Sequence, residues 1–213
     1  MAKTRAPLLS FGASGQIGKT QVYATWRGVP YARQLVTPAN PNTAGQKLTR
    51  TAFSFLNAVW KLAAAEALAP WDANAAGRPY TGRNKFISVN NSGLRTATDL
   101  QDLVGSPGAA GGLAAAAVTA TGGSGTIAVA LTAPGLPTDW TITQAIAWAM
   151  VDGDAQADAS PTSFTQTDDS TPWAPAFSDM AAGDYIVMAW FKYTKADGSI
   201  AYGPSTTVTA TVT

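Results

Sequence analysis

The chain has 213 residues and a formal net charge of +1, and it contains no cysteine and no histidine. These absences exclude disulfides, thiolate nucleophiles, zinc sites built on Cys or His, and every mechanism with a His general acid or base. We therefore predict a protein that is not an enzyme and that uses no cofactor. Only 13% of the residues are charged, which is low for a soluble protein and favours a surface that partners cover.

The segment 11–20, FGASGQIGKT, has three glycines at the spacing of a dinucleotide-binding turn and ends as a P-loop does. A nucleotide site needs a helix after the third glycine, but residues 21–27 alternate between apolar and polar, which indicates a strand. An acidic residue should follow about 20 positions on to hold the ribose, yet the first acidic residue of the chain is Glu66. The segment therefore predicts a glycine-rich turn between two short strands and no nucleotide site.

A long helix is predicted next. Thr43 and Gln46 have the spacing of a capping box, and a wide apolar stripe with alternating steps of three and four residues follows. These signals predict a helix from about 43 to 68, which Pro70 ends, and one further short helix at 71–77.

Residues 105–125 are rich in Gly, Ala and Ser, which predicts a flexible linker. From residue 126 onward the apolar period changes to two, which predicts strands. The strands are expected at 126–131, 141–148, 184–193 and 205–212, with a hairpin turn at Asp197-Gly198. The segment 184–193 is apolar on both faces, as in a central strand. Tyr185 and the residues before it resemble the tyrosine corner of fibronectin-like modules.

The expected fold class is an α+β N-terminal region, made of short strands and one long helix, followed by an all-β immunoglobulin- or fibronectin-like sandwich. The expected divisions are a basic anchoring domain at 1–104, the linker at 105–125 and an acidic sandwich at 126–213. Residues 1–104 hold twelve Lys or Arg and four acidic residues, whereas residues 105–213 hold two Lys and nine Asp. This split between +8 and −7 predicts two parts with different partners.

Three carboxylates at Asp152, Asp154 and Asp158 suggest calcium, but Ser163 stands where a calcium loop would place its bidentate Glu. We therefore predict a solvated turn and no metal site. The cations of the first half are interleaved with aromatic residues, as in proteins that bind single-stranded nucleic acid. They are spread along the chain, however, which favours docking on an acidic protein surface.

Two motifs carry a resemblance to a known family: W-R-G-x-x-Y-x-R at 26–33 and N-P-x-T-x-x-Q-x-x-x-R-x-x-F at 40–53. Together with Gly15, Gly18, Trp60 and Trp71, they resemble the N-terminal region of a set of tailed-phage and prophage virion proteins. They are also similar to a bacterial domain of unknown function with W-K-G-x-x-Y-x-R and N-P-x-T-x-x-Q motifs. The resemblance covers about the first 95 residues. It implies a structural virion component, often with an appended β-sandwich, and it assigns no catalytic or ligand residues.

We therefore expect a capsid-decorating or head-associated protein, made in the host bacterial cytoplasm and located in the virion. A tail or head–tail joining component is the alternative within this class, and a nucleic-acid-binding protein or a glycan-binding or hydrolytic module are the alternatives outside it. The expected partners are the major capsid protein or another virion protein, and further copies of the chain, with a host-surface glycan left open for the sandwich. No membrane is expected. The expected interface residues are Trp26, Arg27, Tyr31, Arg33, Asn40, Pro41, Gln46 and Arg50. In the alternative interpretation, Trp26 and Tyr31 pack on the chain's own helix.

Overall fold

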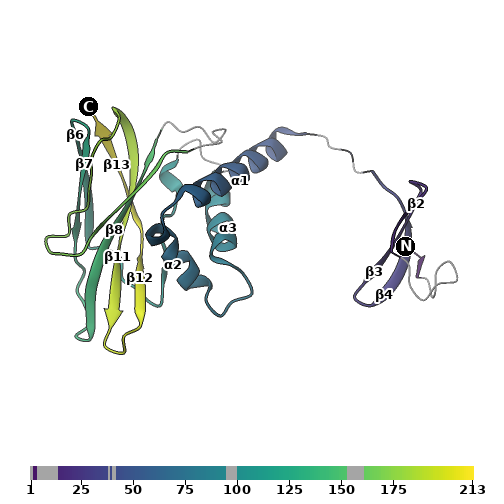
Figure 1. The fold of residues 1–213 in the computed structure, drawn as a ribbon, viewed down its shortest axis with the longest axis horizontal. Helices are drawn as coiled ribbons and strands as arrows, with labels where there is room; N and C mark the ends of the chain where they lie inside the picture. Colours follow the sequence, from purple (N-terminus) through teal and green to yellow (C-terminus); the bar gives the residue numbers. More distant parts are fainter. Residues whose placement is uncertain (1, 4–13, 38, 40–41, 95–99, 153–160) are drawn as a thin grey trace. The chain divides into compact units, whose positions relative to one another are not determined.

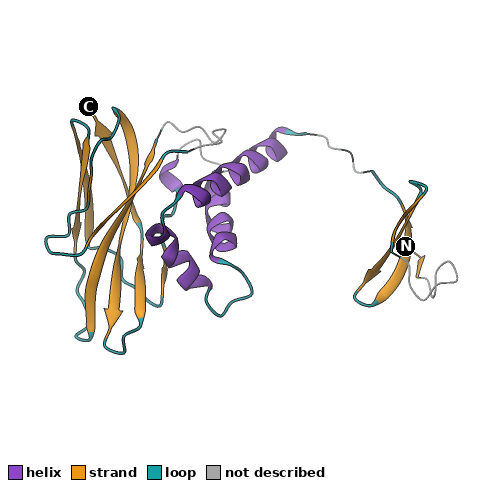
Figure 2. Cartoon of the chain, in the orientation of Figure 1, coloured by secondary structure: helices purple, strands orange, loops and turns teal. Residues whose placement is uncertain are grey.

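The computed structural model describes residues 2–3, 14–37, 39, 42–94, 100–152 and 161–213 (Figures 1 and 2). The chain divides into two compact units, Met1–Asn42 and Thr43–Thr213. Among the described residues, the N-terminal unit has strands and no helix, whereas the C-terminal unit combines helices with a β-sandwich.

The N-terminal unit is a four-stranded antiparallel sheet in the order β1-β4-β3-β2. Its strands are β1 (Ala2–Lys3), β2 (Gly15–Ile17), β3 (Gln21–Trp26) and β4 (Val29–Gln34). Gly18 and Lys19 form the centre of the turn between β2 and β3, with φ of 56° and 54°. Arg27 and Gly28, with φ of 49° and 79°, join β3 to β4. Two successive residues with positive φ are the signature of type I′ hairpin turns. A turn between short strands is confirmed at residues 18–20, whereas residues 15–17 of the same segment form β2 and residues 11–13 lie outside the described residues.

Helices open the C-terminal unit: α1 (Ala44–Leu62), α2 (Ala65–Ala75) and α3 (Gly82–Leu94), followed by the 3₁₀ turn η2 (Leu100–Asp102). The start of α1 is confirmed, since the Thr43 hydroxyl accepts from the Gln46 amide and the Gln46 side chain accepts from the Thr43 amide. The predicted end is wrong. Extended backbone at residues 63 and 64 ends α1, and Pro70 lies buried inside α2. This break lets each helix turn its own apolar face to the same core, where Val59 and Trp71 both lie.

The rest of the C-terminal unit is a sandwich of two antiparallel sheets (Figure 2). One sheet has the order β10-β7-β6. In the other, β11 lies at the centre, with β8 on one side and β12 and β13 on the other. The strands are β5 (Pro107–Ala109), β6 (Ala117–Gly123), β7 (Thr126–Thr132), β8 (Trp140–Val151), β9 (Ser163–Asp168), β10 (Ala176–Phe177), β11 (Gly183–Lys195), β12 (Ile200–Pro204) and β13 (Thr206–Val212).

All four predicted strands are present, as β7, β8, β11 and β13. The hairpin at Asp197-Gly198 joins β11 to β12, with the Lys195 amide donating to the Ser199 carbonyl at 3.0 Å. The Asp197 carboxylate accepts hydrogen bonds from Ser199, and these lower its pKa. The predicted fold class, α+β with a β-sandwich, is confirmed.

The sheet centred on β11 is buried on both faces because two different layers cover it. Residues of one parity, including Trp148, Met188 and Trp190, pack against the helices. Residues of the other parity, including Val187 and Phe191, pack against the second sheet. The helices lie along one side of the sandwich in Figure 1. The predicted central strand is thus confirmed, but one of its two covers is a helical layer that the sequence did not indicate.

The segment predicted as a linker is built into the C-terminal unit. Trp71 donates from Nε1 to the Gly105 carbonyl at 2.7 Å, and the buried Ser106 hydroxyl donates to the Gly203 carbonyl at 2.7 Å. Strands β5 and β6 follow within residues 105–125. A Cβ at Gly105 would lie 2.9 Å from the Cβ of Met188, so this glycine permits close packing. The structure therefore has no domain boundary at residue 104 or 126. The boundary between its two compact units follows residue 42.

Tyr185 makes the kind of hydrogen bond that the resemblance to a tyrosine corner predicts. The Tyr185 hydroxyl donates to the Ala181 carbonyl at 2.9 Å, across the approach to β11. The side chain itself is buried in the core between the two sheets. This hydrogen bond fixes how the chain enters the central strand.

Candidate interaction surfaces

One face of the N-terminal sheet gathers three of the predicted interface residues. Residues directly opposite each other on paired strands point to the same face. Trp26 is opposite Val29, Tyr31 is opposite Ala24, and Arg33 is opposite Val22. Alternation along β3 and β4 then places Trp26, Tyr31 and Arg33 on one side of the sheet. We call this side the Trp26 face.

The Trp26 face is exposed, and its unit has no core among the described side chains. Trp26 is 66% exposed and Val29 is 42% exposed. None of the side chains described between residues 14 and 37 is buried. A small sheet normally needs a packed apolar face for independent stability, and large exposed apolar side chains commonly mark interaction surfaces. The Trp26 face has the character of a surface that another molecule covers.

The charge of this unit has one sign. Residues 1–42 contain five Lys or Arg and no Asp or Glu. The guanidinium of Arg27 lies 5.1 Å from the centroid of the Trp26 ring, within range of a cation–π contact. Arg27 also holds a left-handed backbone that side chains rarely adopt, at the tip of the hairpin. The unit therefore offers an aromatic surface flanked by cations.

The remaining predicted interface residues are not part of this face. Asn40 and Pro41 lie outside the described residues. Gln46 forms the capping box of α1 with Thr43. This structural role explains the presence of Gln46 at this position, and no contact with another protein is needed to explain it. Arg50 is exposed on α1, near Gln46 and Thr49. The structure thus brings together Trp26, Arg27, Tyr31 and Arg33 and assigns Gln46 and Arg50 to a different unit.

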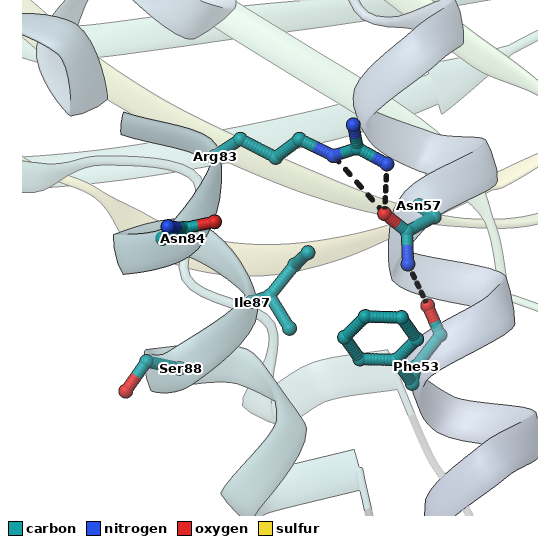
Figure 3. A pocket seen from close by; sticks show the side chains of 6 residues that line it. All are labelled: Phe53, Asn57, Arg83, Asn84, Ile87 and Ser88. Carbon is teal, nitrogen blue, oxygen red and sulfur yellow. Dashed lines mark hydrogen bonds between the residues drawn. The ribbon is translucent and has the colours of Figure 1, made fainter. Parts of the chain in front are cut away.

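A second surface feature was not predicted: a hollow of about 370 Å³ between α1 and α3, which we call the α1–α3 hollow. Its lining residues are Phe53, Asn57, Arg83, Asn84, Ile87 and Ser88. Figure 3 shows Phe53 and Ile87 pointing toward one another from the two helices, with Arg83 reaching across to Asn57. A signal for it exists in the sequence, because Gln46, Arg50, Phe53, Asn57 and Trp60 form a second helical stripe with steps of four and three.

The hydrogen bonds of the hollow hold Arg83 in place. The Asn57 Oδ1 accepts from both Nε and Nη2 of Arg83, at 3.0 Å for Nε. The Asn57 Nδ2 donates in turn to the Phe53 carbonyl at 2.6 Å, one turn earlier on α1. The amide of Asn57 is therefore oriented at both ends, and it presents its oxygen to the guanidinium.

Two features of the described part of the chain bear on metal and nucleotide binding. No group of three or more His, Cys, Asp or Glu within it could hold a metal ion. Asp154 and Asp158 of the considered calcium turn lie outside the described residues. The glycine-rich segment continues into strand β3, not into the helix that a pyrophosphate would need.

Among the described residues, no helix combines the length and the apolar character that spanning a membrane requires.

No protein-family model and no curated protein matches the chain. Among solved structures, a myokine structure aligns at 18% identity with a TM-score of 0.35, over 48% of this chain and 99% of that one. A polysaccharide deacetylase from Bacillus cereus aligns at 14% identity with a TM-score of 0.30, over 44% of this chain and 29% of that one. Both TM-scores are below 0.5, so neither similarity carries an argument about function.

Proposed function

We propose that the chain is a non-enzymatic structural component of a tailed-phage virion, of the capsid-decorating or head-associated kind. Its N-terminal unit docks on a neighbouring virion subunit, and its C-terminal unit projects from that contact. The observation that carries the proposal is the Trp26 face, an exposed aromatic surface in a unit without a buried side chain among its described residues. The two motifs that resemble virion proteins begin in the same unit. A tail or head–tail joining position is the alternative within the proposal.

The partner surface in this proposal is acidic. Five cations without a single carboxylate within residues 1–42 favour a partner of opposite charge. Buried Trp, Tyr and Arg dominate the energy of many protein interfaces, and Arg pairs with a carboxylate through two parallel hydrogen bonds. In the assembled particle, Trp26 and Tyr31 fill apolar pockets of the partner, while Arg27 and Arg33 pair with its carboxylates.

The docking part is shorter than the sequence suggested. The helices of residues 44–94 share a core with the sandwich, so they belong to the projecting unit. We assign docking to residues 1–42 in place of 1–104. We further propose that the sandwich is immunoglobulin- or fibronectin-like, which its antiparallel sheets and the Tyr185 corner support.

The test is co-sedimentation of the full chain with undecorated particles. The double variant Arg27→Ala, Arg33→Ala should melt like wild type yet bind at least about 30-fold more weakly, because the loss of even one buried ion pair costs roughly 2–5 kcal/mol. The double variant Lys47→Ala, Lys61→Ala removes the same charge from α1 and serves as the matched control. Equal losses of particle binding in the two double variants would contradict the proposal. Unfolding of the Arg27→Ala, Arg33→Ala variant in the absence of particles would contradict it as well.

Single-stranded nucleic acid is the second candidate partner, and the exposed Trp26 ring beside Arg27 is the observation that favours it. Bases stack on such rings while the guanidinium contacts phosphate. Titration with labelled oligothymidylate at two salt concentrations separates the candidates. Saturable, salt-dependent binding that Trp26→Ala abolishes would favour nucleic acid, and its absence leaves the virion-protein surface as the partner.

A further inference from the structure

The α1–α3 hollow combines an apolar floor with a fixed cation. Phe53 is 52% exposed, and Ile87 faces it from α3, so apolar surface remains open to an incoming side chain (Figure 3). Asn57 holds two nitrogen atoms of Arg83. The remaining N–H donors of this guanidinium have no partner among the described residues, and no carboxylate there pairs with it. A cation that is already oriented loses little freedom when it binds an anion.

The electrostatic surroundings favour an anion at the same place. Helices α1 and α3 together carry Lys47, Arg50, Lys61, Arg83 and Lys85 and no acidic residue. Arg83 and Lys85 lie in the first turn of α3, where the helix dipole already places positive partial charge. The carboxylate of Asp72 on α2 lies beside Gly82 at this helix start. Asp72 is not among the residues that line the hollow, where no carboxylate faces the guanidinium of Arg83, so a bound carboxylate would offset that charge.

We propose that the α1–α3 hollow binds an acidic segment of a partner protein. One carboxylate of the segment pairs with Arg83, and one apolar side chain next to it packs against Phe53 and Ile87. The site goes beyond the proposed function, because it lies in the C-terminal unit and does not involve the Trp26 face. It gives the projecting unit a contact of its own.

The apolar floor distinguishes this ligand from a nucleic acid. A single-stranded nucleic acid binds through several cations along its path and several stacked bases, whereas the lining of the hollow offers one aromatic ring, Phe53, beside the aliphatic Ile87. A peptide supplies both groups on one face, since a carboxylate and a Leu two positions apart in an extended segment point to the same side. Phe53 and Arg83 are thus expected to contribute together, which defines the test.

The experiment uses the full chain and an acetylated, amidated peptide with the repeat Glu-Ser-Leu-Ser, with a peptide of the repeat Gln-Ser-Leu-Ser as its neutral counterpart. Binding is followed by NMR through the Arg83 Nε–H and Ile87 methyl signals. We expect saturable shifts with the acidic peptide only. Arg83→Gln should weaken binding at least about tenfold, and Phe53→Ala about fivefold. Lys61→Gln, which removes a charge from α1 outside the hollow, should change it less than about twofold.

Arg83→Lys provides a second reading, because it keeps the charge but loses the planar fork that Asn57 orients. It should bind more weakly than wild type and more tightly than Arg83→Gln. If Lys61→Gln weakens binding as much as Arg83→Gln does, the attraction is diffuse charge and the proposal is wrong. Absence of shifts at millimolar peptide, or tighter binding of oligothymidylate at the same signals, would overturn it as well.

Discussion

The two units of this chain differ in how far they bury their apolar side chains. The C-terminal unit buries both faces of its central sheet, one under helices and one under a second sheet. The N-terminal unit has no buried side chain among those described between residues 14 and 37, and it exposes Trp26 and Val29. We infer from this difference that the N-terminal unit depends on a partner for its stability. Under this proposal, the buried residues of the C-terminal unit maintain the fold, and the exposed residues of the N-terminal unit serve assembly.

The largest expected effect on stability is the loss of Trp71 in the C-terminal unit, and the exposed Trp26 of the N-terminal unit is its counterpart. Trp71 is fully buried, packs edge-on against Phe86 with 5.2 Å between ring centroids, and donates to the Gly105 carbonyl. Trp71→Ala should lower the free energy of unfolding by about 3–5 kcal/mol. Trp26→Ala, at a 66% exposed site, should change it by less than about 0.5 kcal/mol. Urea denaturation of the two variants tests the contrast, and similar losses would mean that Trp26 is also part of a core.

A smaller effect is expected at a glycine of the former linker. Gly105→Val forces a side chain against Met188 and Trp190, so it should cost about 1–3 kcal/mol. Gly135→Val is the matched control, because a Cβ there would meet nothing within 4 Å. Thermal melts of both variants give the comparison. Wild-type stability in Gly105→Val would show that this segment is a flexible connection after all.

The smallest expected effect is on the pH dependence of the free energy of unfolding. Burial raises the pKa of Tyr193 to about 12, and its hydroxyl donates to the Leu113 carbonyl at 2.8 Å. The unfolded tyrosine titrates near pH 10. Below that pH both states keep the proton; between about 10 and 12 the unfolded state loses it first, so the free energy of unfolding falls as pH rises. Tyr193→Phe should flatten that fall in urea melts between pH 9 and 12. An unchanged slope would assign the alkaline loss to other groups.

Local signals predicted much of this fold. Alternation located β7, β8, β11 and β13, the Thr43–Gln46 pair located the start of α1, and Asp197-Gly198 located a hairpin. Each of these signals reflects interactions within a few residues. Helix α3 gave no such signal, because it buries the polar Asn90 and has no pronounced apolar stripe. The Asn90 Nδ2 donates to the Phe86 carbonyl within α3 and to the Val104 carbonyl, and its Oδ1 accepts from the distant Val104 amide at 2.7 Å.

The high glycine content of residues 105–125 led to the wrong prediction of a linker between two domains. A glycine at a flexible joint and a glycine at a tight contact look the same in sequence, because only the tertiary neighbours distinguish them. Gly105 lies against Met188, and Gly122 lies against the backbone of Thr211. The predicted interface residues show a similar limit. The motif at 26–33 places Trp26, Tyr31 and Arg33 close together in sequence, but only the strand register shows that they share a face.

The central claim is that the N-terminal unit is completed by a partner and the C-terminal unit is complete by itself. Hydrogen exchange of the full chain, alone and on undecorated particles, tests it most directly. We expect residues 15–34 to exchange rapidly in the free chain and to become protected on particles, while β8 and β11 stay protected in both. Protection of residues 15–34 in the free chain at the level of β11, or new protection confined to the sandwich on particles, would contradict the account.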